Sequence, residues 1–372
     1  MLRHPLFIGH EIYRRSSYGG AHPLRVPRVS TVMDLCRALG WLPDQHYRLS
    51  PRAKPAALTQ WHSPEYIDAL IRAETLQDVS VQERAQFQLG THSNPIFAEM
   101  FRRPATSAGG SILAGELLAK PGRVYVPGGG THHGMPERAN GFCYLNDVVL
   151  AILSLRHNGI RRIAYVDIDA HHPDGVAVGF HGDPDILMIS IHEENLWPRT
   201  GDIEDDAGGS AINLPVPRGF NDSEMELVRE RLILPALIQF EPEAIVFQCG
   251  ADAVVEDPLA HLALSNNAHW SVLAALMPLA PRILALGGGG YNPWSVARLW
   301  SGVWATLNGF DIPTYLPNPA QAVLAGLEFK GHSLGRNPPA HWFTTLRDQP
   351  RIGPIRDEID ARIMYLRQRS GL

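Results

Sequence analysis

The sequence contains little cysteine, almost no lysine and no excess of basic residues. Its three cysteines, Cys36, Cys143 and Cys249, are scattered and odd in number, which predicts a reducing, cytoplasmic environment rather than a disulfide framework. Only three lysines accompany the arginines, and the formal net charge is −5. This charge balance provides no basic footprint for nucleic acid, so we expect no nucleic-acid partner.

Long apolar runs are also missing. The stretch in "MLRHPLFIGHEIYRR" is too short for a signal peptide, and the longest one, 270–286, is interrupted by Pro278, Pro281 and Arg282. We therefore expect no membrane span. The 372 residues are 45% hydrophobic and 19% charged, which is typical of a globular protein with a large core. Their number suits one large α/β domain or two ordinary ones. No repeat or obvious linker divides them, and our expectation is a single domain over 1–372.

Short β-rich runs alternate with helical stretches along the chain. The predicted strands are "RVYVPG" (123–128), "RIAYVDID" (162–169), "DILMISIH" (185–192), "EAIVFQCG" (243–250) and "RILALGGG" (282–289). Helices are predicted at 105–120, 145–159, 222–240 and 266–280, and Asp222 or Ser223 is the expected N-cap of the third. Such near-continuous apolar strands are typical of a sheet buried on both faces, so the alternation predicts a doubly wound, parallel α/β fold.

Polar or glycine-rich segments follow nearly every predicted strand. They are "GGGTHHG" (128–134), "DAHHPDG" (169–175), "HEENLW" (192–197), "GAD" (250–252) and "GGGGYN" (287–292). Open α/β sheets bind ligands at the carboxyl ends of their strands. We therefore expect these segments to face one crevice.

The segment around residue 169 has the composition of a metal site. Asp167, Asp169 and His171 share one face if the strand continues to its end, so two of them can bind a cation while the third serves a neighbour. Asp252, a lone acid after another strand, can supply the third ligand. Oxygen and nitrogen donors without cysteine favour Zn²⁺ or Fe²⁺, and three protein ligands leave room for water and substrate. The alternative is a solvated loop with ordinary caps.

Two adjacent histidines and a tyrosine supply further candidate groups. The glycines before His132 and His133 allow the backbone to turn both rings into one pocket. A histidine there can take a proton from a metal-bound water, and Asp167 and Asp174 can orient the rings. Tyr291 can donate to an oxyanion. Surface histidines and a rim aromatic are the alternatives, whereas no GxSxG elbow or phosphate-loop signature is present.

Taken in order, the motifs resemble a known family. They are "PGGGTHHG", "GFCYLND", "VDIDAHHPDG", "SIH", "GAD" and "GGGGY", extended by "HPLRVPR", "HSPEYID" and "NPIF" nearer the N-terminus. This order resembles the zinc-dependent histone deacetylases and their bacterial relatives of the acetoin-utilization type, from near residue 20 to about 310. The resemblance implies an arginase/deacetylase-like, three-layer α/β fold with a central, mostly parallel eight-stranded sheet. Residues 311–372 would be a C-terminal extension packed on the same domain.

The resemblance also implies two metal sites. Asp169, His171 and Asp252 would hold the catalytic ion, Zn²⁺ or alternatively Fe²⁺. A structural K⁺ would lie near Asp167, Asp169, His171, Ser190 and Ile191.

Further site residues follow from the same resemblance. His133 would be the general base and acid, and His132 would stabilise charge beside it. Asp167 would orient His132, and Asp174 would orient His133. Tyr291 would polarise the amide carbonyl. The narrow acyl-lysine tunnel would be walled by Gly141, Phe142, Trp197 and Leu259.

The sequence departs from the family pattern at two places. Pro173 stands in "HHPDG" where relatives usually carry glycine, and because proline fixes φ and lacks an N–H, we expect a reshaped loop around Asp174. His92 and Ser93 stand where relatives often carry an acid that clamps the substrate backbone. We expect this second change to alter substrate preference.

These observations predict a metal-dependent amidohydrolase that removes acetyl or other acyl groups from the ε-amine of lysine or a related amine. One alternative is an acetylpolyamine or small-amide deacetylase, although the acidic loop typical of those relatives is missing from 85–105. Another is a non-catalytic acyl-lysine-binding module, which the complete set of catalytic residues disfavours. The expected partner is an acylated lysine or acylated small amine, and a homo-oligomer is compatible with the sequence.

Overall fold

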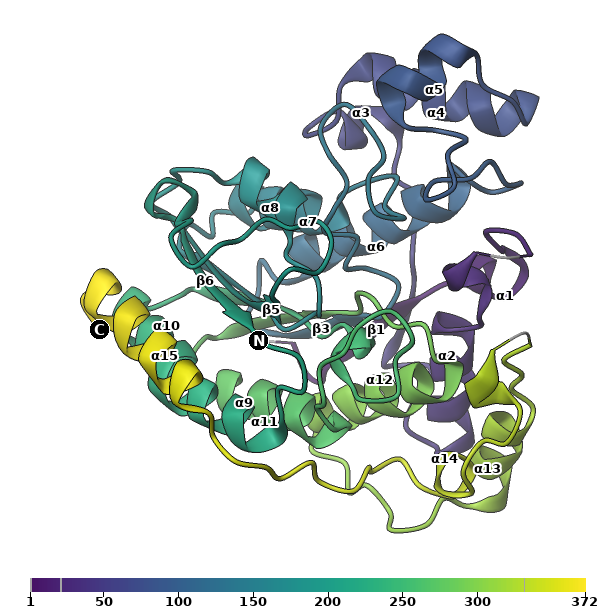
Figure 1. The fold of residues 1–372 in the computed structure, drawn as a ribbon. Coiled ribbons are helices and arrows are strands. Elements are labelled where there is room, and N and C mark those ends of the chain that lie inside the picture. The colour runs from purple at the N-terminus through teal and green to yellow at the C-terminus, as the bar shows by residue number, and fades with distance from the viewer. Residues whose placement is uncertain (1, 21, 331) are drawn as a thin grey trace.

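The computed structural model describes residues 2–20, 22–330 and 332–372, and it is organised around one eight-stranded sheet (Figure 1). The strands are β1 (Leu6–Gly9), β2 (Tyr47–Leu49), β3 (Gly122–Val126), β4 (Ile163–Asp167), β5 (Ile186–Glu193), β6 (Ala211–Val216), β7 (Ala244–Gln248) and β8 (Arg282–Leu286). Their order is β2-β1-β3-β8-β7-β4-β5-β6, and all neighbouring pairs are parallel. The expected eight-stranded α/β fold is confirmed.

Helices cover both faces of this sheet. They are α1 (Ile12–Arg15), α2 (Val29–Ala38), α3 (Pro55–Leu58), α4 (Pro64–Leu76), α5 (Val81–Phe87), α6 (Arg102–Leu117), α7 (Asp147–His157), α8 (Asp174–Gly179), α9 (Asp222–Val228), α10 (Leu234–Phe240), α11 (Asn266–Leu276), α12 (Pro293–Asn308), α13 (Asn318–Ala325), α14 (His341–Thr344) and α15 (Asp357–Ser370). Within the described ranges, every helix is too short or too polar to cross a bilayer.

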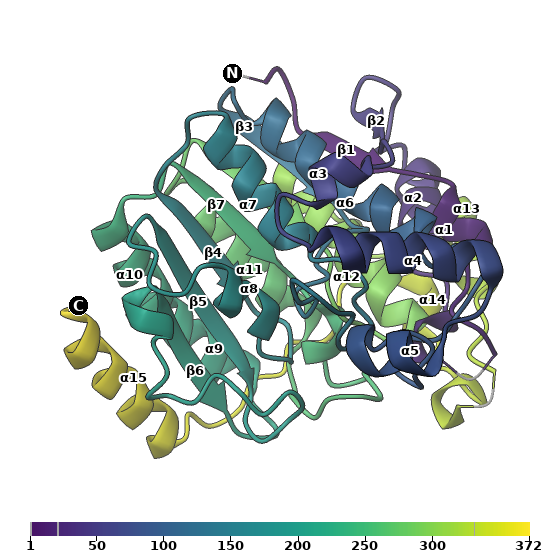
Figure 2. The same ribbon diagram turned by 90° about the horizontal axis from the view of Figure 1, so that it is seen from above.

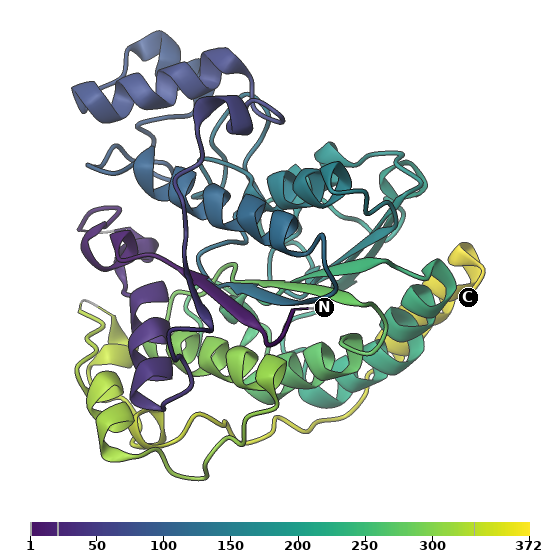
Figure 3. The same ribbon diagram turned by 180° about the vertical axis from the view of Figure 1, so that it is seen from behind.

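Strand alternation divides the core into two apolar layers. Tyr165 on β4 packs in a cluster with residues of α6, α7 and α8. The next residue, Val166, packs on the other face with α2 and α9 to α12. Figures 1 and 3 show the sheet between these two groups of helices, with α3, α4 and α5 standing beyond it on the α6 side. The sheet is buried on both faces, as its apolar strands predict.

The predicted helix over 222–240 is interrupted in the structure. A π-helical segment, Arg229–Ile233, separates α9 from α10, and it directly precedes the turn that contains Pro235, whose ring nitrogen carries no N–H. The expected N-cap at Asp222 or Ser223 is wrong, because the Asn221 side chain accepts the N–H groups of Ser223 and Glu224. Asp222 instead accepts hydrogen bonds from Ser265 at 2.8 Å (N–H) and 2.6 Å (hydroxyl).

The segment after residue 310 packs on the layer formed by α2 and α9 to α12. Trp342 is buried and stacks on Trp294 of α12, with ring centroids 5.3 Å apart. A buried ion pair joins Arg298 to Asp348 at 2.6 Å. The last helix, α15, lies along β6 at one edge of the sheet (Figure 2).

Candidate active site

A buried group of three side chains forms where β4 and β7 end. Strand β4 stops at Asp167, so Asp169 and His171 lie in the following loop and not on an extended strand as expected. In that loop the Asp167 carboxylate accepts the N–H of Asp169 at 2.9 Å, and Asp169 accepts the N–H of His171 at 3.0 Å. These bonds take the place of the hydrogen bonds between strands. Together with the loop after β7, this loop brings ligand atoms of Asp169, His171 and Asp252 within 4.8 Å of one another.

The donor set and its surroundings fit a divalent metal. Nδ1 of His171 lies 2.9 Å from Asp252 and 3.3 Å from Asp169. Burial lowers the pKa of His171, but the two carboxylates outweigh burial and raise it to about 10. A Cβ at Gly289 would lie 2.0 Å from an Asp252 oxygen, and one at Gly250 would lie 2.0 Å from an Asp169 oxygen. Only glycine therefore lets the backbone approach both carboxylates, and two oxygens plus an imidazole suit Zn²⁺ or Fe²⁺.

The two adjacent histidines lie side by side in the loop after β3. Their ring centroids are 4.0 Å apart. Nδ1 of His132 lies 2.8 Å from Asp167, and Nδ1 of His133 lies 2.7 Å from Asp174. Gly130 makes this turn possible, because its φ is +94° and a Cβ would lie 2.6 Å from the nitrogen of Gly288.

The environments of these two rings differ. Burial lowers the pKa of His132, but the carboxylates of Asp167 and Asp169 outweigh it and raise the pKa to about 9. Burial, and then the charge of His132, lower the pKa of His133 to about 4. At neutral pH one ring is therefore a cation and its neighbour is neutral.

Pro173 does not separate Asp174 from its histidine. Pro173 precedes the first turn of α8, and Asp174 is the first residue of that helix. One carboxylate oxygen of Asp174 lies 2.7 Å from Nδ1 of His133, and the other accepts a hydrogen bond from the side-chain amide of Asn140 at 2.9 Å. The contact between Asp174 and His133 is therefore made with proline in place.

Tyr291 follows the four glycines after β8. Its side chain is buried, and its N–H donates to Asp257 at 2.7 Å. Arg28 donates to the carbonyls of Gly288 and Gly290 at 2.9 and 3.2 Å, which holds the glycine turn. Burial raises the pKa of the Tyr291 hydroxyl, which therefore stays protonated as a donor.

Aromatic side chains surround the approach to His133. The indole of Trp197, 43% exposed, lies edge-on to His133 with centroids 4.6 Å apart. A Cβ at Gly141 would be 2.2 Å from that indole, so glycine is needed where the ring lies. Phe142 is held at φ +68° and packs edge-on against Tyr291 at 6.0 Å. Leu259 packs in the same cluster as Phe142 and Tyr291.

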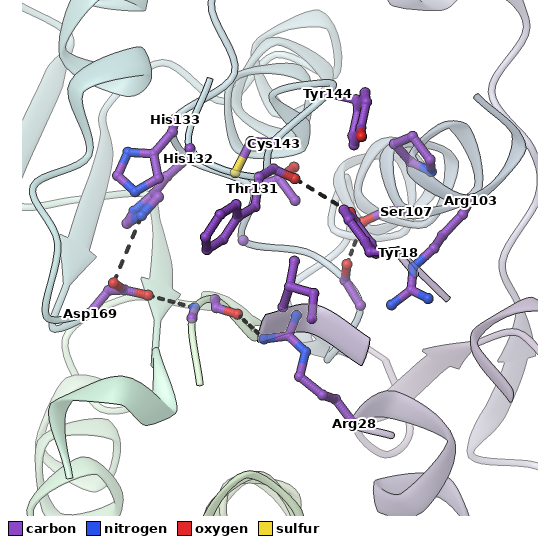
Figure 4. Close-up of a pocket in the computed structure, with 18 of the residues that line it drawn as sticks. Tyr18, Arg28, Arg103, Ser107, Thr131, His132, His133, Cys143, Tyr144 and Asp169 are labelled. Atoms are coloured by element: carbon purple, nitrogen blue, oxygen red, sulfur yellow. Dashed lines mark hydrogen bonds and ion pairs between the residues drawn. The ribbon is translucent and has the colours of Figure 1, made fainter. Parts of the chain in front are cut away.

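Many of these groups line one pocket (Figure 4). His132, His133, Asp169, His171 and Tyr291 face it, together with Gly141 and Phe142. Tyr18, Arg28, Arg103 and Ser107 line the same pocket on the side away from His133 and Asp169 (Figure 4). The structure thus gathers the predicted residues around one pocket. Asp167, Asp174 and Asp252 do not line it, but they contact the lining residues His132, His133 and His171. Trp197 and Leu259 also lie outside its lining.

Several supporting residues were missed by sequence reasoning. Asp147, fully buried, accepts the N–H groups of Gly130 and Thr131 at 3.1 and 2.7 Å. Asn146 donates to the carbonyls of His132 and Gly134. Asn146 is the N-cap of α7 and Asp147 is its first residue, positions where Asn and Asp are read as ordinary helix-start residues. Only their position inside "GFCYLND" signalled another role.

Comparison with known proteins gives consistent results. The family model of the histone deacetylase domain matches residues 22–307. The acetoin utilization protein AcuC of Bacillus subtilis is 31% identical over 324 residues, covering 83% of this chain and 84% of AcuC. Human histone deacetylase 1 is 32% identical, covering 85% and 67%. Among solved structures, an HDAC homolog from Aquifex aeolicus is 31% identical with a TM-score of 0.92, covering 98% of this chain and 100% of the other, and an HDAC homolog complexed with SAHA gives 0.93 at the same identity and coverage.

Proposed function

The chain belongs to the histone deacetylase family and is a hydrolase that deacetylates acyl-lysine, and we propose that it does so with a Zn²⁺ ion held by Asp169, His171 and Asp252. Fe²⁺ is the alternative ion for this donor set. The observation that carries the proposal is the convergence of this group, two His–Asp pairs and Tyr291 on one pocket. When bound, the metal polarises the amide carbonyl and lowers the pKa of water.

The chain's own residues provide the proton transfers. His133, neutral at pH 7 and held at Nδ1 by Asp174, accepts the proton of the attacking water at Nε2 and returns it to the leaving amine. His132, a cation beside it, stabilises negative charge as it develops on the carbonyl oxygen. The Tyr291 hydroxyl donates to that same oxygen.

Side chains at the approach to the pocket would select the substrate stem. Phe142 and Trp197 would flank a linear alkyl chain between the surface and His133, and Gly141 leaves room for it. Leu259 would complete the wall. We also propose a structural K⁺ near Asp167, Asp169, His171, Ser190 and Ile191. Its support is that Asp167 and Ser190 are register partners on neighbouring strands.

We propose a single cytoplasmic domain over 1–372. Its support is one apolar cluster that includes residues from Phe7 to Leu366, and three free, buried cysteines. A blocked, fluorogenic acetyl-lysine amide, assayed with and without chelator, tests the proposed activity. Turnover that chelator abolishes and Zn²⁺ restores is expected, whereas substrate binding without turnover would identify an acyl-lysine-binding module.

Tyr291→Phe should lower kcat about 10²–10³-fold, because it removes one donor to the developing oxyanion. Folding should survive, since the ring keeps its packing against Phe142 and its N–H keeps its bond to Asp257. Steady-state kinetics and thermal unfolding check both statements. A loss below threefold would remove Tyr291 from the mechanism.

The absence of an acid at Ser93 should make the protein indifferent to peptide length. Ser93 is exposed, and the rim segment it belongs to is anchored by Asn94, which accepts the N–H of Phe142 at 3.1 Å. Charge-assisted hydrogen bonds are roughly twice as strong as neutral ones, so a serine clamps a peptide backbone weakly. We expect similar kcat/KM for a minimal acetyl-lysine amide, an acetylated small amine and a histone-tail peptide.

Ser93→Asp should then favour the peptide selectively, and Gln86→Asp, which adds the same charge at an exposed position of α5, is the control. A wild-type preference for the peptide above about 100-fold, equal to about 2.7 kcal/mol, would show that other residues supply the clamp.

A further inference from the structure

The C-terminal helix α15 lies outside the segment that the family model matches, and the mechanism above does not use it. Three apolar residues of α15, Ile359, Ile363 and Leu366, are buried against the body of the protein. The helix runs beside the edge strand β6 (Figure 2). Any role of α15 therefore depends on the residues that it contacts at this edge of the sheet.

A polar row of α15 faces a single loop. Arg362, Tyr365 and Arg369 follow one another at spacings of three and four residues, which places them on one side of the helix. We call residues 194–206, between β5 and β6, the Trp197 loop. All three side chains reach this loop.

Each residue of the row binds a different acid of the loop. Arg362 lies 2.8 Å from Glu194. The Tyr365 hydroxyl donates to Glu204 at 2.6 Å. Arg369 donates to Asp206 at 2.9 Å and also to the carbonyl of Ile203 at 3.0 Å. Both ends of the Trp197 loop are therefore tied to α15.

The Trp197 loop has a backbone conformation that its surroundings must impose. Asn195 and Arg199, on either side of Trp197, have φ values of 61° and 62°, a backbone region that residues other than glycine keep only when their surroundings impose it. A cavity of about 310 Å³ lies between α15 and the C-terminal half of the loop, lined by Ile203, Leu366 and Arg369 among others. The body of the protein also holds the middle of the loop, where the Thr200 hydroxyl lies 2.8 Å from Nδ1 of His172 and the Gly201 carbonyl lies 3.0 Å from Nε2 of His192. The polar contacts of α15 add a hold at the two ends of the loop.

The indole carried by this loop has little tolerance for displacement. It lies 4.6 Å from the His133 ring, and Gly141 is so close that no Cβ would fit. A shift of the loop would therefore change the width of the approach to His133.

We propose that α15 is a clamp on the Trp197 loop, and that Arg362, Tyr365 and Arg369 are positioning residues that set how tightly the acyl stem is bound. The proposal rests on the proposed function, in which Trp197 walls the approach to the metal. Because no residue of α15 reaches the reacting atoms, loosening the clamp should raise KM and leave kcat nearly unchanged.

The test compares two sets of contacts made by the same helix. The variant R362A/Y365F/R369A removes the row, whereas Asp360→Asn breaks the 2.7 Å pair between α15 and Arg231, away from the loop. Kinetics on an uncharged, blocked acetyl-lysine amide should show KM raised about fivefold in the triple variant, with kcat within twofold of wild type. Hydrogen exchange of 194–206 should become faster. Asp360→Asn should change neither.

Salt provides a second, independent measurement. The acids and arginines of these pairs are partly exposed, and screening shortens the Debye length from about 10 Å at 0.1 M salt to 3 Å at 1 M. KM of the wild type for the uncharged substrate should therefore rise with NaCl, and KM of the triple variant should not.

A variant in the Trp197 loop controls for the possibility that the triple variant unfolds α15. Glu194→Gln combined with Glu204→Gln leaves α15 intact and should reproduce the rise in KM. Unchanged exchange of 194–206 in the triple variant would overturn the clamp, and faster exchange with unchanged KM would overturn its role in binding. If the wild type turns over no acyl-lysine substrate, the proposed function fails, and hydrogen exchange alone still decides whether α15 holds the loop.

Discussion

Asp252→Ala should leave the purified protein without stoichiometric Zn²⁺ and without measurable deacetylase activity. Asp252 supplies one of three candidate ligands, and two protein ligands rarely retain a catalytic ion. The metal-free fold should survive the change. Burial and then the charge of Asp169 raise the pKa of Asp252, so the ionised carboxylate is disfavoured in the metal-free protein and its removal should not destabilise that state. Metal analysis of the purified variant and a turnover assay provide the measurement.

The control for this prediction is Asp185→Asn. Asp185 directly precedes β5, at the opposite end of the strands from the site, and pairs with Arg161 near the surface. Added Zn²⁺ should raise the unfolding temperature of the wild type and of this control, since a ligand that binds only the folded state stabilises it. It should not raise that of Asp252→Ala. Stoichiometric metal and a near-normal rate in Asp252→Ala would show that the ligand assignment is wrong.

The location of the site could be predicted from the sequence because parallel strands share an edge. Asp169, His171 and Asp252 follow two different strands, β4 and β7, and these strands are direct neighbours in the sheet. Apolar runs indicated both strands, and polar residues directly after each run indicated the edge. No long-range information was needed to expect these side chains in one crevice.

The strands that the pattern did not indicate are mostly at the margins of the sheet. β2 and β6 are its two edge strands, and β1 is next to β2. β2 has only three residues, half-buried or exposed, and β6 contains Asn213 and Pro215. An edge strand has one unpaired side and can carry polar residues and proline, so its local signal is weak. The eight-stranded total came from the family resemblance and not from the pattern.

The supporting residues of the site could not be predicted for a different reason. Asp147 and Asp257 act on backbone N–H groups of distant loops, those of Gly130, Thr131 and Tyr291. Such contacts depend on the shape of glycine turns that no periodicity encodes. Candidates for chemistry can be recognised by residue type, whereas residues that hold a loop in place are recognised only once the loop has a shape.

Replacing His133 and replacing His132 should have very different effects on kcat. His133→Ala should lower kcat about 10²–10⁴-fold, the range typical of general acid–base catalysis, whereas His132→Ala, which leaves the His133–Asp174 pair in place, should cost far less. Metal content should be unchanged in both variants, because neither ring belongs to the Asp169, His171 and Asp252 group. Equal and small losses would show that neither histidine is the base.

The pH dependence follows from the same geometry. His133 must be neutral to accept a proton, so activity is present above its pKa and is lost as the pH falls through it. Burial and the charge of His132 lower the pKa of His133 from the ordinary 6.5 to about 4, so the acidic limb of kcat/KM should lie below pH 6.5. Removing the cation in His132→Ala removes the second of these causes but not burial. An acidic limb that stays at the same pH in His132→Ala would therefore mean that the charge of His132 does not lower the pKa of His133, and that burial alone keeps His133 neutral.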